Sequence, residues 1–296
     1  SDAWFALSDV VRSQFSPDGR YLAVRTSTQF QLYDMWEETP ALIIEDEANG
    51  NPFEGTQLAF SPNGEWISIN RFDSYPVQTV RVWDIATGAI VADITQEFYL
   101  VDQLALSPTE PILLISHRTG AEYWNGFVTV WDFEQNQIIS TYNPRGGADF
   151  ISLSPDGERV MIEEANGSGR WIVLFNYKTG TTQDVIGESI PLACPCSVSP
   201  TWEQAVLHYP QPIDDPMLVN LSTLDRHLLG DDYGERFGDV EWSFDGRYFA
   251  AVEGTGGVKI TDMEMEGWLR IGISIYAGRL PSIRFRHTAY IIAPAY

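Results

Sequence analysis

Short runs of apolar residues that alternate with polar ones recur along the whole chain. One run ends at Phe60, another at Leu106 and another at Leu153, each directly before a Ser-Pro dipeptide. Alternation with a period of two is typical of a β-strand with one buried face. The 3.6-residue period of an amphipathic helix is not sustained in any part of the sequence. The pattern therefore predicts an all-β protein.

The Ser-Pro motif sets the length of an internal repeat. Six copies align on Ser16, Ser61, Ser107, Ser154, Ser199 and Ser243. Successive serines lie 45, 46, 47, 45 and 44 residues apart, and a seventh, decayed copy occupies residues 283–290. A repeat of this length, with several short strands in each copy, indicates a repeat architecture in which neighbouring units share a core.

Each repeat predicts four antiparallel strands. The Asp18-Gly19 pair and its equivalents allow the positive φ angles of a tight hairpin between the first and second strands. A third apolar run ends in an acidic or amide residue, as at Asp84, and Thr87-Gly88 makes the turn into a fourth run. Sheets this small cannot bury both faces alone, so the repeats predict a ring of stacked blades. We expect a single β-propeller domain over residues 1–296.

These motifs resemble those of the WD-repeat family. The resemblance rests on the Ser-Pro-Asp-Gly hairpins, on the dipeptides Trp83-Asp84 and Trp131-Asp132, and on the repeat length. The Gly-His dipeptide of the family is absent, and several repeats replace Trp-Asp, as in Tyr33-Asp34. We therefore expect a divergent, prokaryotic member. The resemblance implies a rigid, non-catalytic platform for protein partners.

Blade number depends on how the chain ends pair. Six complete blades are visible in the repeats, together with the first two strands of a seventh. We expect residues 4–7 to join residues 283–285 and 290–293 and so to close a seventh blade. A six-bladed ring is the alternative.

Charge narrows the range of partners. The chain has a formal net charge of −23 and a sequence pI near 4.3. Such a protein repels the phosphates of nucleic acids and anionic bilayers. No apolar stretch approaches the roughly 20 residues that span a bilayer. We expect no nucleic-acid partner and no direct membrane insertion, while the compartment stays open with an extracytoplasmic location favoured over a cytoplasmic one.

Motifs of known catalytic chemistry are absent from the sequence. It contains no G-x-S-x-G elbow, no H-E-x-x-H, no phosphate-binding P-loop and no EF-hand loop. Cys194 and Cys196 are expected to be inert thiols, because a disulfide across one residue is strained. We therefore expect no catalytic residue, no cofactor and no metal site.

Acidic and aromatic residues follow the second strand of several repeats. In a propeller, the loops between the second and third strands lie at the same end as the links between blades. The candidate partner-binding residues in these loops are Asp73, Tyr75, Glu122, Tyr123, Trp124, Glu163, Glu164, Asp214, Asp215 and Glu253. Together they predict a docking rim for a basic or arginine-bearing protein, through charge complementarity and cation–π contacts. The alternative is that a chain this acidic carries acidic loops everywhere.

Three functions remain in competition on these grounds. The first is the non-catalytic interaction platform, a scaffold or adaptor subunit that binds through the predicted rim. The second is an extracytoplasmic structural or envelope component of a larger assembly. The third is the propeller domain of an enzyme whose catalytic part lies elsewhere. Because one fold hosts many functions, the fold alone does not choose among them.

Overall fold

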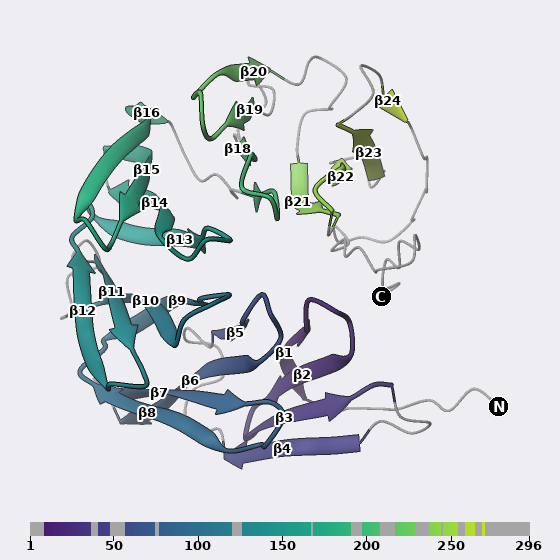
Figure 1. The fold of residues 1–296 in the computed structure, drawn as a ribbon, viewed down its shortest axis with the longest axis vertical. Coiled ribbons are helices and arrows are strands. Elements are labelled where there is room, and N and C mark those ends of the chain that lie inside the picture. Colours follow the sequence, from purple (N-terminus) through teal and green to yellow (C-terminus); the bar gives the residue numbers. More distant parts are fainter. Residues whose placement is uncertain are drawn as a thin grey trace. The chain divides into compact units, whose positions relative to one another are not determined.

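The computed structural model describes residues 9–36, 41–47, 57–74, 77–119, 126–166, 168–190, 197–207, 217–228, 237–243, 245–253, 258–263 and 268–269. Every helix or strand within these ranges is a β-strand (Figure 1). The strands form six four-stranded antiparallel sheets whose strands are paired in chain order. The expected all-β architecture of four-stranded repeats is confirmed.

The sheets follow the six Ser-Pro repeats. Sheet 1 contains β1 (Val10–Phe15), β2 (Tyr21–Thr26), β3 (Gln29–Asp34) and β4 (Ala41–Glu47). Sheet 2 contains β5 (Leu58–Phe60), β6 (Trp66–Ser74), β7 (Val77–Asp84) and β8 (Ile90–Gln96). Sheet 3 contains β9 (Leu100–Leu106), β10 (Ile112–Arg118), β11 (Gly126–Asp132) and β12 (Gln137–Tyr142).

The remaining sheets repeat the pattern. Sheet 4 contains β13 (Gly147–Leu153), β14 (Arg159–Asn166), β15 (Gly169–Asn176) and β16 (Thr181–Ile190). Sheet 5 contains β17 (Ser197–Val198), β18 (Gln204–Leu207), β19 (Met217–Asn220) and β20 (Arg226–Leu228). Sheet 6 contains β21 (Phe237–Trp242), β22 (Tyr248–Glu253), β23 (Val258–Asp262) and β24 (Trp268–Leu269).

The chain forms two compact units. The first comprises Ser1–Gly167 with Ile172–Asp184, and the second comprises Ser168–Trp171 with Val185–Tyr296. Sheets 1 to 3 and most of sheet 4 belong to the first unit, and sheets 5 and 6 belong to the second. The predictions of one domain and of seven blades stay predictions, because residues 1–8 and 270–296 lie outside the described ranges.

Neighbouring sheets of the first unit bury their apolar faces against each other. Phe30 of sheet 1 packs on Trp83 of sheet 2, with ring centroids 5.1 Å apart. Trp131 of sheet 3 joins a buried cluster with Val80 and Val82 of sheet 2. In the second unit, Trp242 packs with residues of sheets 5 and 6. Trp83, Trp131 and Trp242 therefore fill the core between neighbouring sheets.

The Ser-Pro hairpins hold their shape through the serine. In the first hairpin, the Ser16 hydroxyl donates to Asp18 at 2.5 Å and accepts from the Tyr21 backbone N–H at 2.8 Å. Gly19 follows with a φ of 73°, a conformation that costs other residues energy. The predicted tight hairpin is confirmed, and it recurs with the serines of the other repeats.

The outermost strands of sheets 1, 2 and 3 share a β-bulge. Pairing shifts by one residue opposite Tyr33, Trp83 and Trp131, so Ile43, Val91 and Ile139 are the extra residues in β4, β8 and β12. A bulge turns two consecutive side chains toward the same side. The aliphatic pairs exposed by these bulges are Leu42 with Ile43, Ile90 with Val91, and Ile138 with Ile139.

Candidate interaction site

Part of the predicted docking rim lies within the described ranges. The structure describes Asp73, Glu163 and Glu164 with their side chains. For Glu253, the last residue of β22, it describes the backbone only. The other candidates, which lie outside the described residues, are Tyr75, Glu122, Tyr123, Trp124, Asp214 and Asp215. We call the end of each sheet that carries this rim the connection end, and the opposite end, with the Ser-Pro hairpins, the hairpin end.

The loop placement of Glu163 and Glu164 was wrong. Both residues lie within β14, opposite Phe150 and Ala148 of β13, and both side chains are buried. The apolar run that marks this strand ends at Ile162, but the strand continues through polar residues to Asn166. These carboxylates are therefore interior groups of sheet 4 and not part of an exposed rim.

Arginines neutralise the carboxylates at the connection end. Buried Glu164 accepts hydrogen bonds from the Tyr142 hydroxyl and, at 3.0 Å, from Arg145 Nη1. Arg118 donates to Asp102 at 2.8 Å, and burial raises the pKa of Asp102 despite this contact. Asp73 at the end of β6 pairs with Arg71 at 2.7 Å. The described acids here have cationic partners within the chain, which reduces what they offer to a basic protein.

A cavity of about 500 Å³ lies at the hairpin end, between sheets 3 and 4 of the first unit. Its lining residues are Glu110, Pro111, Ile112, Asp132, Glu134, Gln135, Ile139, Tyr177 and Lys178. They come from the hairpin before β10, from β12 and the turn that precedes it, and from the turn after β15. The cavity opens to solvent, because Glu134, Gln135 and Lys178 are exposed.

The third hairpin departs from the repeat on one side of this cavity. Glu110 and Pro111 stand where the first repeat has Gly19 and Arg20. The Ser107 hydroxyl still accepts from the Thr109 and Glu110 backbone N–H groups, at 3.3 and 3.2 Å. The hairpin therefore keeps its support from serine while presenting an acid and a proline in place of a glycine and an arginine.

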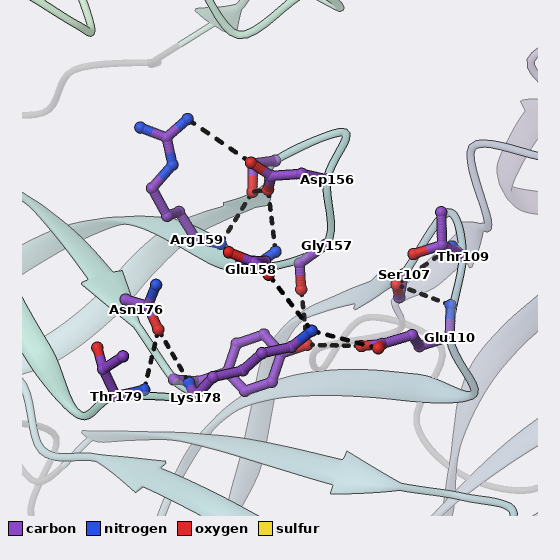
Figure 2. Close-up of polar contacts among 12 residues, drawn as sticks. Ser107, Thr109, Glu110, Asp156, Gly157, Glu158, Arg159, Asn176, Lys178 and Thr179 are labelled. Atoms are coloured by element: carbon purple, nitrogen blue, oxygen red, sulfur yellow. Dashed lines mark hydrogen bonds and ion pairs between the residues drawn. The ribbon is translucent and has the colours of Figure 1, made fainter.

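Glu110 bridges sheets 3 and 4 (Figure 2). Its Oε1 accepts a hydrogen bond from Lys178 Nζ at 3.2 Å, and its Oε2 lies 3.3 Å from the Tyr177 hydroxyl. Lys178 also lies 3.7 Å from Glu158, and the hydrogen bond to Glu110 raises the pKa of its ammonium group. Only one other lysine, Lys259, occurs in the chain. Glu110, Lys178 and Glu158 thus form an ion-pair network at one side of the cavity.

The fourth hairpin touches the third at the same place. Gly157 has a φ of 71°, and a Cβ added there would lie 3.0 Å from Ser107 Oγ and 3.1 Å from Thr109 Oγ1. The Tyr177 hydroxyl donates to the Gly157 carbonyl at 2.6 Å. Burial raises the pKa of the Tyr177 phenol, and the negative charge of Glu110 raises it further. The phenol is therefore a neutral donor that fixes the two hairpins together.

Asp132 lacks the arginine that pairs with Asp34 in sheet 1 and with Asp262 in sheet 6. Asp84 of sheet 2 also lacks it, because Glu65 takes that place, and it accepts instead from the Thr87 hydroxyl at 2.8 Å. In sheet 1, Asp34 Oδ1 accepts from the Trp36 backbone N–H at 3.0 Å, and Oδ2 accepts from Arg20 Nη2 at 2.7 Å and Nε at 2.9 Å. Asp132 Oδ1 likewise accepts from the Gln135 backbone N–H, at 2.8 Å. Because Pro111 replaces the arginine, Asp132 makes no ion pair within the described part of the chain. It is only 8% exposed and lines the cavity.

Metal binding and acid–base chemistry are two further activities that side chains can supply. Within the described ranges, no group of three or more His, Cys, Asp and Glu side chains is close enough to hold a metal ion. Buried His117 forms a hydrogen bond of 2.9 Å between its Nε2 and the Thr129 hydroxyl, and burial lowers the pKa of the imidazole to about 4. Cys194 and Cys196 lie outside the described residues. The expectations of no catalytic residue, no cofactor and no metal remain predictions.

Comparisons with known proteins bear on the family and the fold. No protein-family model matches the chain. Periodic tryptophan protein 2 of Arabidopsis thaliana is 22% identical over 180 residues, which cover 60% of this chain and 19% of that protein. The chain thus spans about a fifth of the length of this relative. A solved structure of Kuenenia stuttgartiensis hydrazine synthase has a TM-score of 0.61 at 15% identity, over 89% of this chain and 79% of that one.

The likeness to periodic tryptophan protein 2 agrees with the resemblance to WD-repeat proteins. The structural likeness, together with the four-stranded antiparallel sheets, shows the β-propeller fold of this chain. The number of blades and the prokaryotic origin stay predictions. Among the described residues, no helix has the length and hydropathy needed to cross a membrane.

The predicted rim accounts neither for the arginine-paired acids at the connection end nor for the cavity at the hairpin end. The sequence pattern missed the cavity at the hairpin end, although two departures from the repeat could have revealed it. These are the replacement of Arg20 by Pro111 beside a retained aspartate, and the placement of Lys178 in a chain with few lysines. Both departures meet in one cavity only after the sheets pack, so neither indicates a site by itself.

Proposed function

We propose that this WD40-like chain is a non-catalytic platform that binds a protein partner. The observation that carries the proposal is the set of aliphatic pairs on β4, β8 and β12 (Figure 1). Each of these six side chains is between 38% and 53% exposed, although each lies within a strand. Exposed aliphatic residues that recur at one structural position are typical of a protein-binding surface.

The three pairs all lie in the first unit, and those of sheets 1 and 2 are near each other. The sheet 2 turn at Gly88 lies against the bulge of β4, because a Cβ on Gly88 would be 3.4 Å from the Ile43 carbonyl oxygen. The bulge residue of β12, Ile139, lines the cavity between sheets 3 and 4. We define Leu42, Ile43, Ile90, Val91, Ile138 and Ile139 as the aliphatic edge. The cavity adjoins its last member.

Charge favours a basic or arginine-bearing partner. The net charge of −23 attracts such a protein over a distance set by the ionic strength, and it repels nucleic acid. Buried apolar contacts then supply most of the free energy of a specific complex, since exposed ion pairs contribute little. The aliphatic edge and the acidic charge thus have complementary roles in this proposal.

Partner capture by matched variants tests the proposal. The double substitution Ile90→Ser with Val91→Ser should abolish stoichiometric capture of the partner from source cells, as measured by native mass spectrometry. Thr181 and Thr182 are exposed at the start of β16, the outermost strand of sheet 4, and provide the control. Exchanging both for serine should leave capture unchanged. Equal capture by the wild-type and Ile90/Val91 proteins, with equal melting temperatures, would contradict the proposed surface.

The catalytic alternative rests on a different observation. The similar solved structure carries the name of an enzyme, hydrazine synthase, so the propeller of a longer enzyme stays a second candidate. An extracytoplasmic structural component is the third. A native chain much heavier than 33.3 kDa, with no separate partner, would favour the enzyme candidate over the platform.

A further inference from the structure

We infer that the cavity between sheets 3 and 4 receives an arginine side chain of the partner protein and that Asp132 accepts its hydrogen bonds. The inference rests on the proposed function, because it names the group that the platform recognises. It depends on a comparison among repeats of the same chain. The arginine beside the aspartate that ends the third strand is present in sheets 1 and 6 and absent in sheets 2 and 3. In sheet 2 the aspartate accepts from the Thr87 hydroxyl, whereas in sheet 3 it lines the cavity.

Sheets 1 and 6 show what the position binds. In sheet 1, Arg20 donates twice to Asp34, and in sheet 6 Arg247 donates to Asp262 at 2.9 Å through Nη2 and at 3.2 Å through Nε. Each guanidinium also lies over the ring of the next residue, 4.9 Å from Tyr21 and 5.0 Å from Tyr248. The aspartate at the end of the third strand is therefore built to hold a guanidinium that arrives from the hairpin end.

Sheet 3 keeps the aspartate that accepts these hydrogen bonds but has no arginine in the hairpin to donate them. Asp132 retains the turn hydrogen bond through Oδ1, as Asp34 does, and it is buried to the same extent. Pro111 stands at the position of the arginine of sheets 1 and 6, and both Pro111 and Asp132 line the cavity. A buried carboxylate without a cation is costly, so a guanidinium from another chain gains an ion pair there that is largely removed from water.

The rest of the lining fits an arginine better than a lysine. Pro111, Ile112 and Ile139 present apolar surface to the aliphatic part of the side chain. Glu134 adds a second carboxylate on the same turn as Asp132, which suits the several donors of a planar guanidinium. A lysine ammonium is compact and more strongly hydrated, so it loses more on entering the cavity.

Lys178 does not fill this role from within the chain. Its ammonium group is held by Glu110 at 3.2 Å and lies 3.7 Å from Glu158. The charged residues of the lining are Glu110, Asp132, Glu134 and Lys178. After Lys178 and Glu110 neutralise each other, two carboxylates remain, so the cavity attracts a cation.

A titration with small arginine probes tests the inference directly on the full chain. N-acetyl-arginine N-methylamide should shift the NMR signal of the Gln135 backbone amide in a saturable manner, because that N–H is bonded to Asp132. The corresponding lysine amide should bind at least about tenfold more weakly, and the uncharged citrulline amide should cause no saturable shift. Equal responses to all three amides, or no response to the arginine amide, would overturn the inference.

Three variants locate the binding to Asp132. Asp132→Asn keeps an oxygen for the Gln135 N–H and should weaken the arginine probe by about tenfold or more, the loss expected for a charged hydrogen bond. Pro111→Arg restores the arginine of sheets 1 and 6 and should fill the cavity, so the probe no longer binds. Asp84→Asn, at the equivalent position of sheet 2, is the control and should leave binding unchanged. Probe binding that survives Pro111→Arg in the folded protein would contradict the assignment.

The probe and the partner experiments separate two kinds of failure. Probe binding that is lost with Asp132→Asn, combined with full capture by the Ile90/Val91 variant, would support the arginine site and reject the aliphatic edge. Capture that depends on the aliphatic edge, without any response of Gln135 to the arginine probe, would support the platform and reject the arginine site.

Discussion

The two ends of the first unit treat acidic side chains in opposite ways. At the connection end, Glu164 is buried and Asp102 is partly buried, and each accepts a hydrogen bond from an arginine of the chain. At the hairpin end between sheets 3 and 4, Asp132 is also buried but faces a cavity whose lining includes no arginine. In a chain this acidic, the number of carboxylates says little about binding. The informative feature is a buried carboxylate whose partner is missing.

Charge reversal of Glu164 should give the largest effect and test whether the connection end is structural. Glu164→Lys places an ammonium group in a buried position beside Arg145. Breaking a buried ion pair in this way should lower the free energy of unfolding by about 3 kcal/mol or more, as measured by urea denaturation. Asp73→Lys, at the solvent-exposed end of β6, should cost less than about 1 kcal/mol. Similar losses for both variants would remove the distinction between buried and exposed acids.

Crowding at the hairpin end should give the next effect. Gly157→Ala introduces a Cβ at a positive φ and 3.0 Å from Ser107 Oγ, whereas Gly19→Ala has a similar φ and no atom within 4 Å. The first should lower the free energy of unfolding by about 2 to 3 kcal/mol and the second by about 1 kcal/mol. Equal losses would mean that the third and fourth hairpins do not hold each other as described.

Tyr177→Phe removes one hydrogen bond from the same contact. The hydroxyl donates to the Gly157 carbonyl at 2.6 Å, and its loss should cost about 1 kcal/mol of unfolding free energy. The Lys178–Glu110 ion pair should persist, so the arginine probe should still bind. Loss of probe binding in a variant of unchanged stability would show that the phenol contributes to the site and not to the hairpins.

The smallest expected effect is on stability at acid pH. It comes from Asp34, which occupies the position of Asp132 in sheet 1 and is paired with Arg20. The hydrogen bond from Arg20 holds the pKa of Asp34 below its ordinary value of 3.8. The unfolded chain therefore binds more protons between the two pKa values, so this stabilisation is complete above about 3.8 and is lost as the pH falls through the folded pKa. Asp34→Asn and Arg20→Gln should flatten the acid limb of the stability curve to the same degree. A limb unchanged in both variants would mean that the pair contributes nothing to stability.

Much of the fold could be predicted from the repeat. The alternation before each Ser-Pro, the Asp-Gly hairpins and the Trp-Asp strand ends all depend on local geometry that the sequence records directly. The placement of Trp83 and Trp131 between sheets followed from the same two-residue period and is confirmed.

The site could be predicted only in part, for physical reasons. Glu163 and Glu164 continue β14 beyond its apolar run, so no alternation marks them as strand residues. Buried Glu164 is bonded to Tyr142 and Arg145, which come from elsewhere in the chain. The cavity depends on Glu110 meeting Lys178 across 68 positions of sequence, a contact that no local pattern encodes. The missing arginine at Pro111 is visible in the sequence, but its meaning depends on the pairing of Arg20 with Asp34.

The bulges of β4, β8 and β12 also affect how the molecule behaves at high concentration. An outermost strand offers free backbone groups to any strand that approaches, and aliphatic side chains make such encounters adhesive. A bulge interrupts the regular spacing of donors and acceptors near the start of each strand, so a second strand cannot form a continuous ladder along its whole length. The chain can therefore display isoleucine, valine and leucine to water while resisting the growth of fibrils by edge-to-edge stacking.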